Sequence, residues 1–249
     1  MGEIRVGTSG WAYPSWRGDF FPPGLVQRTE LSYLAERVSA LEINGSFYAL
    51  QKPTSYRRWR DATPDDFVFA VKGSRFITHL KRLRDVEQAL ARFFGSGLEE
   101  LRPKLGPVLW QLPATQAFDP ALLADFYALL PRTLGGRPVR HALEFRNRSF
   151  CVDEAFAQLR EHDIACVISD SPGRWPMAEA VTSDLVYVRL HGHTELYASG
   201  YAPASLDRWA ERCRAWARDA DVHVYFDNDA RGRAPWDAVR LLMALDGRE

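Results

Sequence analysis

Residues 141–170 read HALEFRNRSFCVDEAFAQLREHDIACVISD, and this stretch decides the fold. It opens with the strand-like run His141–Arg146, continues with an amphipathic, helix-like segment at Asp153–Glu161, and returns to a strand-like run at Ala165–Asp170. A strand, a helix and a second strand in this order are typical of a βαβ unit, in which both strands lie parallel in one sheet.

The same alternation extends along the whole chain. Eight short runs rich in Val, Ile, Leu and Phe are strand-like: Ile4–Ser9, Leu41–Ser46, Phe67–Lys72, Val108–Leu112, His141–Arg146, Ala165–Asp170, Val186–His191 and Val222–Asp227. Most are separated by amphipathic segments: Leu31–Ser39, Asp85–Leu101, Pro120–Leu130, Asp153–Glu161, Leu206–Asp219 and Pro235–Leu245. The pattern predicts an α/β fold, a TIM-type (β/α)8-like barrel of eight parallel strands, as one domain over residues 1–249.

Two segments depart from the ideal barrel. Ser171–Asp184 contains Pro172, Gly173 and Pro176, which break a helix, so the crossover helix after the sixth strand should be missing or reduced. Gly10–Gly24 is rich in proline and also reads as a loop.

Composition restricts the class of protein. Lys and Arg together number 32, as do Asp and Glu, so no global positive field attracts nucleic acid. The three cysteines, Cys151, Cys166 and Cys213, form neither a disulfide framework nor a zinc pattern. A strand-like run directly after Met1 leaves no room for a signal peptide, and no apolar run is long enough to span a membrane. We therefore expect a cytoplasmic protein with no membrane partner.

Polar side chains follow the strand period. In a strand, side chains two residues apart share a face, so Glu144 and Arg146 oppose Leu143 and Phe145. The same phase places a polar or aromatic group near the carboxyl end of every strand-like run: Ser9, Trp11, Glu42, Asn44, Lys72, Gln111, Asp170, Arg189, His191, Tyr225 and Asp227. Active sites of this fold lie at those ends, so a charged pocket is predicted there. A purely structural ion-pair network explains one or two pairs more readily than polar groups on all eight strands.

Several ordered motifs resemble one family along nearly the whole chain. They are Gly7-Thr8-Ser9-Gly10-Trp11 with Trp16 and Phe20-Phe21-Pro22, Glu42-Ile43-Asn44 with Phe47-Tyr48, Phe69-Ala70-Val71-Lys72, Thr78-His79, Gln111-Leu112-Pro113, Glu144-Phe145-Arg146, Arg189-Leu190-His191-Gly192 and Tyr225-Phe226-Asp227-Asn228. Together they are similar to the domain of unknown function 72 family, also called YecE-like. The resemblance implies a barrel fold and no established activity. Asp227 departs from the pattern, in which we expect Asn, and its added negative charge could alter ligand preference.

Four of these residues are candidates for catalysis. Lys72 could donate a proton, or act as an amine nucleophile in a Schiff-base reaction if burial lowers its pKa, but it could also simply pair with Glu42 or Glu144. Either glutamate could serve as a general base, whereas pairing with a cation would leave it a positioning role. His191 could form hydrogen bonds and titrate near neutral pH.

A divalent metal is the alternative role for the same histidine. His191 and His193 form an H-x-H pattern, and Glu144, Asp170 and Asp227 are predicted nearby. This spacing is weak support, so the cofactor is left unknown. For His79 we expect only a cap on the helix that follows.

Two functional hypotheses remain. The first is an acid–base enzyme acting on a polar anionic small molecule, sugar-like or phosphorylated. It uses Glu42, Lys72, Glu144 and His191 for catalysis, and for binding Ser9, Trp11, Asn44, Tyr48, Gln111, Arg146, Asp170, Arg189, Tyr225, Asp227 and Asn228. Arg146 and Arg189 would bind the anion through their guanidinium forks. A sensor that binds the same ligand without turnover is not separated from this enzyme.

The second hypothesis is a nucleic-acid-binding or nucleic-acid-processing protein. The aromatic loop residues would stack on a base, as they could on a sugar under the first hypothesis, or in the simpler alternative form a hydrophobic cluster; they are Trp11, Tyr13, Trp16, Phe47 and Tyr48. Basic residues in Ser55–Arg60 and His79–Arg84 would follow a phosphate backbone, although zero net charge argues against this. Tyr197 and Tyr201 could close the pocket as a lid.

Overall fold

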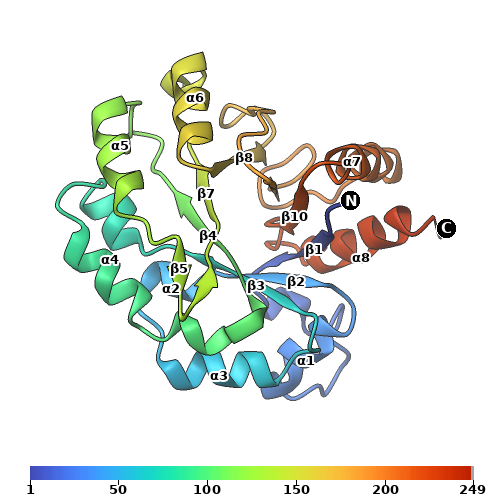
Figure 1. Cartoon of the computed structure of the whole chain (residues 1–249). Helices are drawn as coiled ribbons and strands as arrows, with labels where there is room; N and C mark the ends of the chain where they lie inside the picture. The colour runs from blue at the N-terminus through green and yellow to red at the C-terminus, as the bar shows by residue number, and fades with distance from the viewer. Residues whose placement is uncertain (248–249) are drawn as a thin grey trace.

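Eight parallel strands close into a barrel in the computed structural model, which describes residues 1–247 (Figure 1). The strands are β1 Ile4–Ser9, β2 Ala40–Ile43, β3 Val68–Lys72, β4 Leu105–Gln111, β7 His141–Glu144, β8 Ile164–Asp170, β9 Leu185–Leu190 and β10 Asp221–Phe226. Their order around the barrel is β1-β10-β9-β8-β7-β4-β3-β2, and β1 pairs with both β2 and β10 to close it. The predicted TIM-type fold is confirmed.

A ring of helices surrounds the barrel (Figure 1). The α-helices are α1 Glu30–Ala35, α2 Gly45–Tyr48, α3 Pro53–Asp61, α4 Glu87–Phe94, α5 Pro120–Ala128, α6 Asp153–Glu161, α7 Pro203–Trp216 and α8 Arg233–Leu245. Short 3-10 helices cover Pro14–Trp16, Gln27–Thr29, Leu98–Lys104 and Arg148–Phe150, and a π-helix covers Phe76–Leu80. No helix lies between β8 and β9, as the broken sequence of 171–184 predicted.

Three local features differ from expectation. Helix α3 was not predicted, although Pro53 at its first turn suits a helix start. The helix expected over Asp85–Leu101 ends at Phe94, because Gly97 adopts a φ of 112° that a helix does not permit. The chain also forms a small hairpin, β5 Thr133–Leu134 with β6 Arg137–Pro138.

The apolar core lies between the strands and the helices. Trp110 of β4 is fully buried there, with its ring 5.6 Å from Phe93 of α4 and 5.3 Å from Phe126 of α5. Burying such large rings supplies most of the driving force that holds helices against the barrel. Within residues 1–247, no helix is long and apolar enough to cross a bilayer.

The barrel interior below the pocket is filled by a separate cluster that includes four alanines. The cluster contains Ala40, Ala70, Leu109, Ala142, Ala165, Val167, Leu185, Tyr187 and Tyr225. Gly7 on β1 completes the narrow region, since a Cβ atom there would lie 1.8 Å from the carbonyl oxygen of Ala40 on β2. These residues show which side chains of each strand point into the barrel. The polar side chains further along the same faces form the site.

Candidate functional site

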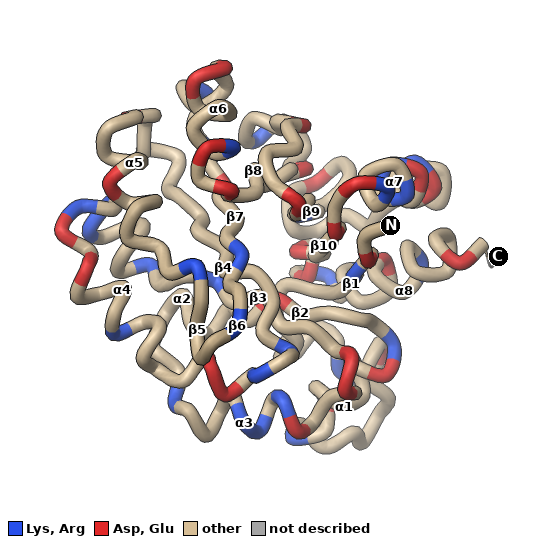
Figure 2. The backbone as a smooth tube through the Cα atoms, in the orientation of Figure 1, with Lys and Arg blue, Asp and Glu red and all other residues tan. Residues whose placement is uncertain are grey.

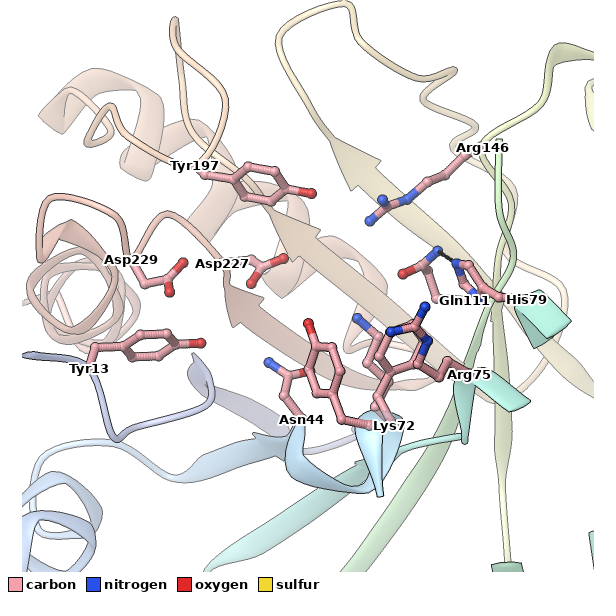
Figure 3. Close-up of a pocket in the computed structure, with 12 residues that line it drawn as sticks. Tyr13, Asn44, Lys72, Arg75, His79, Gln111, Arg146, Tyr197, Asp227 and Asp229 are labelled. Atoms are coloured by element: carbon pink, nitrogen blue, oxygen red, sulfur yellow. Dashed lines mark hydrogen bonds between the residues drawn. The ribbon is translucent and has the colours of Figure 1, made fainter. Parts of the chain in front are cut away.

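A cavity of about 590 Å³ opens at the carboxyl ends of the strands (Figure 3). Residues from the strand ends and the loops after them line it: Tyr13, Asn44, Phe47, Tyr48, Lys72, Arg75, His79, Gln111, Arg146, Tyr197, Asp227 and Asp229. Six of these were predicted as site residues from the sequence: Asn44, Tyr48, Lys72, Gln111, Arg146 and Asp227.

The cavity is electrically polarised. Lys72, Arg75 and Arg146 lie on one side, while Asp227 and Asp229 face them from the other (Figure 3). A ligand filling the cavity therefore meets cations at one end and carboxylates at the other.

Arg189 on β9 forms the floor beneath the cavity. Its side chain is fully buried and donates to Glu42 Oε1 and Oε2 at 2.8 and 3.0 Å, to Glu144 Oε2 at 2.7 Å, and to Asp227 Oδ2 at 3.0 Å. These carboxylates raise the pKa of Arg189 although burial alone would lower it. One guanidinium thus binds carboxylates that approach from three other parts of the barrel.

Glu42 is occupied entirely by neighbours within the barrel. Besides Arg189, it accepts hydrogen bonds from Ser9 and from the Tyr187 hydroxyl, the latter at 2.7 Å. Asn44 donates to Ser9 Oγ at 2.7 Å, so it connects this buried group to the cavity wall. Tyr225 lies deeper, with its ring 5.0 Å from Tyr187.

Glu144 connects the floor to the cationic wall. Its Oε1 accepts from Arg146 Nε at 2.9 Å, and Arg146 also stacks 3.6 Å above the ring of Trp175. Burial acts to raise the pKa of Glu144, but Arg146 and Arg189 outweigh it and hold that pKa well below its usual range. Glu144 is therefore ionised at neutral pH and orients Arg146 toward the cavity.

Lys72 at the end of β3 is the one lysine that lines the cavity. Its ammonium lies 4.7 Å from the ring centre of Phe47, and its side chain is nearly buried. Burial and the nearby Arg189 charge lower the pKa of Lys72 to about 8. The charged ammonium and the neutral amine are thus both populated near neutral pH.

Asp229 and His79 have shifted pKa values at opposite sides of the cavity. Burial and the neighbouring Asp227 raise the pKa of Asp229 to about 6. Burial and the Lys72 charge lower the pKa of His79 to about 4, so its ring is neutral, with Nδ1 2.8 Å from Thr78 Oγ1. His79 lines the cavity rather than capping a helix, which corrects the expectation from sequence.

His191 lies beneath the cavity rather than in its wall. Its ring is buried, with Nδ1 2.9 Å from Asp227 Oδ2 and Nε2 3.8 Å from Glu144 Oε1. His193 packs instead against the ring of Tyr201. Throughout residues 1–247, no group of three or more His, Cys, Asp or Glu side chains is arranged to hold a metal ion. Of the ligand set considered from the sequence, His191, Glu144 and Asp227 lie together beneath the cavity, whereas His193 and Asp170 each contact Tyr201 instead.

Six predicted binding residues do not line the cavity: Ser9, Arg189 and Tyr225 lie beneath it, and three others lie outside this group as well. Trp11 packs edge-on against Trp59 at 5.5 Å. Asn228 donates to Ser199 O and Asp237, both at 2.9 Å.

Asp170 is the third, and it accepts a hydrogen bond from the Tyr201 hydroxyl at 2.9 Å. Because Ala165 and Val167 face the barrel interior, Ser169 continues that face and Asp170 points away from it.

Other residues of the site were not predicted to belong to it. Arg75 and Trp175 lie in loops after β3 and β8, where strand periodicity gives no guidance. Tyr187 lies two residues before Arg189, on the same face of β9. Asp229 continues the phase of Tyr225 and Asp227, so this alternation was the signal that could have found it.

A closed parallel barrel with a charged cavity at the carboxyl ends of its strands defines a protein of the TIM-barrel class. Within that class, the chain belongs to the family described as "Protein of unknown function DUF72", whose model matches residues 5–249. The family resemblance inferred from the motifs is confirmed.

Named relatives agree with this assignment. The chain is 33% identical to UPF0759 protein YecE of Escherichia coli (strain K12) over 142 residues, which cover 55% of this chain and 48% of that protein. The match thus spans about half the length of that relative. It is 24% identical to UPF0759 protein YunF of Bacillus subtilis (strain 168), covering 98% of this chain and 95% of that protein.

Solved structures extend the comparison to the fold. A DUF72 family protein (TM1631) from Thermotoga maritima MSB8 is similar with a TM-score of 0.84 and 27% identity, over 98% of this chain and 99% of that one. D-psicose 3-epimerase from Clostridium cellulolyticum H10 superposes with a TM-score of 0.57 at 10% identity, covering 98% of both chains, which shows a shared fold alone.

Proposed function

We propose that this protein is an enzyme that acts on a small, polar, anionic molecule, sugar-like or phosphorylated, by acid–base chemistry at the carboxyl end of the barrel. The observation that supports this most directly is the polarised cavity, in which Lys72, Arg75 and Arg146 face Asp227 and Asp229. Its volume of about 590 Å³ is in the range of small-molecule sites.

In this proposal the arginines hold the anion. Arg75 and Arg146 offer guanidinium forks that match the oxygens of a carboxylate or phosphate. Arg146 is already oriented by Glu144 and Trp175, so less side-chain freedom is lost when a ligand binds. Asn44, Gln111 and Tyr48 supply hydrogen-bonding groups for hydroxyls.

The proton-transfer groups of the proposal are Lys72 and Asp229. Both line the cavity, and their pKa values of about 8 and about 6 bracket neutral pH, where efficient acid–base groups titrate. Glu42 and Glu144 were considered as bases from the sequence, but their oxygens bind Arg189 and Arg146. We assign both glutamates to positioning those arginines, and His191 to positioning Asp227 and Glu144 beneath the cavity.

The structure gives less support to nucleic acid as the partner. Positive and negative residues are mixed around the ring of helices, with no continuous basic stripe in this view (Figure 2). Arg57 and Arg60, within the basic segment Ser55–Arg60, pair with Glu100.

A thermal-shift screen tests the proposal. The ligands are phosphorylated sugars, carboxylates, nucleotides and short oligonucleotides, each with and without divalent metal ions. A ligand present at about 100 times its Kd adds about 2.7 kcal/mol to the free energy of unfolding.

We expect a shift with a small anion that weakens at least about tenfold in apparent affinity in Arg146→Ala, because one charged hydrogen-bonding pair is worth about 1.5–3 kcal/mol. Arg240→Ala is the matched control, since Arg240 is a half-exposed arginine on α8 that pairs with Asp237 and does not line the cavity. A shift with oligonucleotides alone, falling as salt is raised, would favour the nucleic-acid alternative.

A further inference from the structure

We propose that Lys72 forms a reversible imine with a carbonyl group of the ligand, so that the substrate is a small aldehyde or ketone carrying an anionic group. The proposal rests on the proposed function and specifies its substrate class. It starts from the unusual position of this lysine among the paired charges of the site.

The carboxylates beneath the cavity are paired with cations other than Lys72. Arg189 binds Glu42, Glu144 and Asp227, and Arg146 binds the remaining oxygen of Glu144. Lys72 forms no ion pair with any carboxylate of residues 1–247; the contact recorded for its ammonium is with the ring of Phe47. A lysine in the wall of a ligand cavity is thus left without a counterion.

Comparison with the other lysines shows that burial alone does not explain why Lys72 lacks a hydrogen-bonding or charged partner. The chain has four lysines, and Lys52 and Lys81 are exposed. Lys104 is buried, but its ammonium donates to Arg60 O at 2.6 Å and to Thr63 O at 2.8 Å, so it has a structural role. Lys72 has a comparable burial without such acceptors, and its amine faces the cavity instead.

An imine requires a neutral amine. Since burial and Arg189 lower the pKa of Lys72 to about 8, roughly a tenth of the molecules carry the free amine at pH 7, against less than about a thousandth for an ordinary lysine. Arginine could not serve here, because its guanidinium stays protonated. The geometry and the charge environment therefore both favour a nucleophile at this position.

The covalent step balances without a redox partner. The Nζ lone pair attacks the carbonyl carbon, the C–N bond forms, and the π electrons of the carbonyl move to its oxygen. A proton passes from nitrogen to that oxygen to give a carbinolamine. A second proton then reaches the hydroxyl, the C–O bond breaks, and water leaves as the iminium forms. Asp229, which lines the same cavity and has a pKa of about 6, is the proton donor we assign to this loss of water.

The anionic part of the ligand is defined by the cationic wall. Arg75 and Arg146 lie on the same side of the cavity as Lys72 (Figure 3). A carboxylate or phosphate held by these arginines would place an adjacent carbonyl carbon next to the amine. Keto acids, aldehyde acids and carbonyl phosphates have this combination of groups.

Reductive trapping tests the proposal on the intact protein. Glyoxylate, pyruvate and dihydroxyacetone phosphate are each incubated with the protein and sodium cyanoborohydride at pH 7, and formaldehyde serves as a carbonyl without an anion. Peptide mapping by mass spectrometry then gives the rate of modification at each lysine. We expect at least one anionic probe to modify Lys72 about tenfold or more faster than Lys52 and Lys81.

Two variants separate the role of the Lys72 amine from the role of Arg146 in binding the anion. Lys72→Arg should lose the rapid modification while keeping the fold, as checked by circular dichroism. Arg146→Ala should slow trapping of the anionic probes at Lys72 but not trapping of formaldehyde. If no probe modifies Lys72 faster than the exposed lysines, the imine proposal is wrong. An anion-dependent thermal shift that needs Arg146 would then still stand, so failure here is distinguishable from failure of the proposed function.

Discussion

Arg189 and Glu42 form a bidentate ion pair inside the barrel, with Nε–Oε2 and Nη2–Oε1 distances of 3.0 and 2.8 Å and both side chains fully buried. The pair joins β9 to β2 across the barrel, so barrel closure is required to form it. Glu144 and Asp227 bind the same guanidinium. Removing any one of these four side chains therefore changes the charge balance of the buried group beneath the cavity.

The first prediction concerns that balance. Arg189→Met should lower the free energy of unfolding by about 3–5 kcal/mol, because buried carboxylates lose their shared cation. Urea unfolding followed by circular dichroism at pH 7 measures the loss. Arg231→Met, at an ion pair with Glu195 in which both side chains are more than half exposed, should change it by less than about 0.5 kcal/mol. A loss below about 1 kcal/mol for Arg189→Met would mean that the carboxylates do not depend on this cation.

The second prediction is an acid dependence of stability. The pKa of Glu144 in the folded protein lies below its unfolded value, so Glu144 contributes stability above about pH 5 that is lost as the pH falls through the folded pKa. Glu144→Gln should be less stable than the wild type at pH 7 by about 2 kcal/mol or more. Its unfolding free energy should also fall less steeply from pH 5 to pH 2. Parallel curves for the two proteins in this range would contradict the assignment.

The third prediction concerns Asp229, whose contribution to stability changes with pH in the opposite direction to that of Glu144. Its folded pKa of about 6 lies above the unfolded value, so the folded state binds the extra proton and loses stability as the pH rises from about 4 to 6. Asp229→Asn should therefore be more stable than the wild type at pH 7, by about 1 kcal/mol once solvent screening is allowed for. Carboxyl carbon NMR should show the titration directly, and Asp227→Asn should shift it to lower pH. A midpoint near pH 4 in the wild type would refute the shift.

The fourth prediction tests how Arg146 is held. Trp175→Ala removes the ring that lies 3.6 Å from the Arg146 guanidinium, so the affinity for a small anion should fall about threefold to tenfold. Isothermal titration with the best ligand of the thermal-shift screen measures the change. Trp216→Ala is the matched control, because Arg212 lies 5.0 Å from that ring, on α7 and outside the cavity lining. Equal losses in both variants would indicate a general effect on stability.

Much of the fold followed from local patterns. Short runs rich in Val, Ile, Leu and Phe identified all eight barrel strands, and the prolines of 171–184 predicted the missing or reduced helix. Helix α3 and the break after α4 were not predicted, because the first has few apolar residues and the second depends on a single glycine conformation. Local sequence constrains such boundaries only loosely.

The sequence by itself determined that charged groups face the barrel interior, since the two-residue period of a strand is a local property. Only the tertiary structure decided which of them reach the cavity. Glu42 and Glu144 are satisfied by Arg189, which lies far from both in the sequence, whereas Lys72 is left unpaired and Asp229 enters from a loop. The physical reason is that charge pairing depends on distances of a few ångströms between strands, and these distances exist only after the barrel has closed.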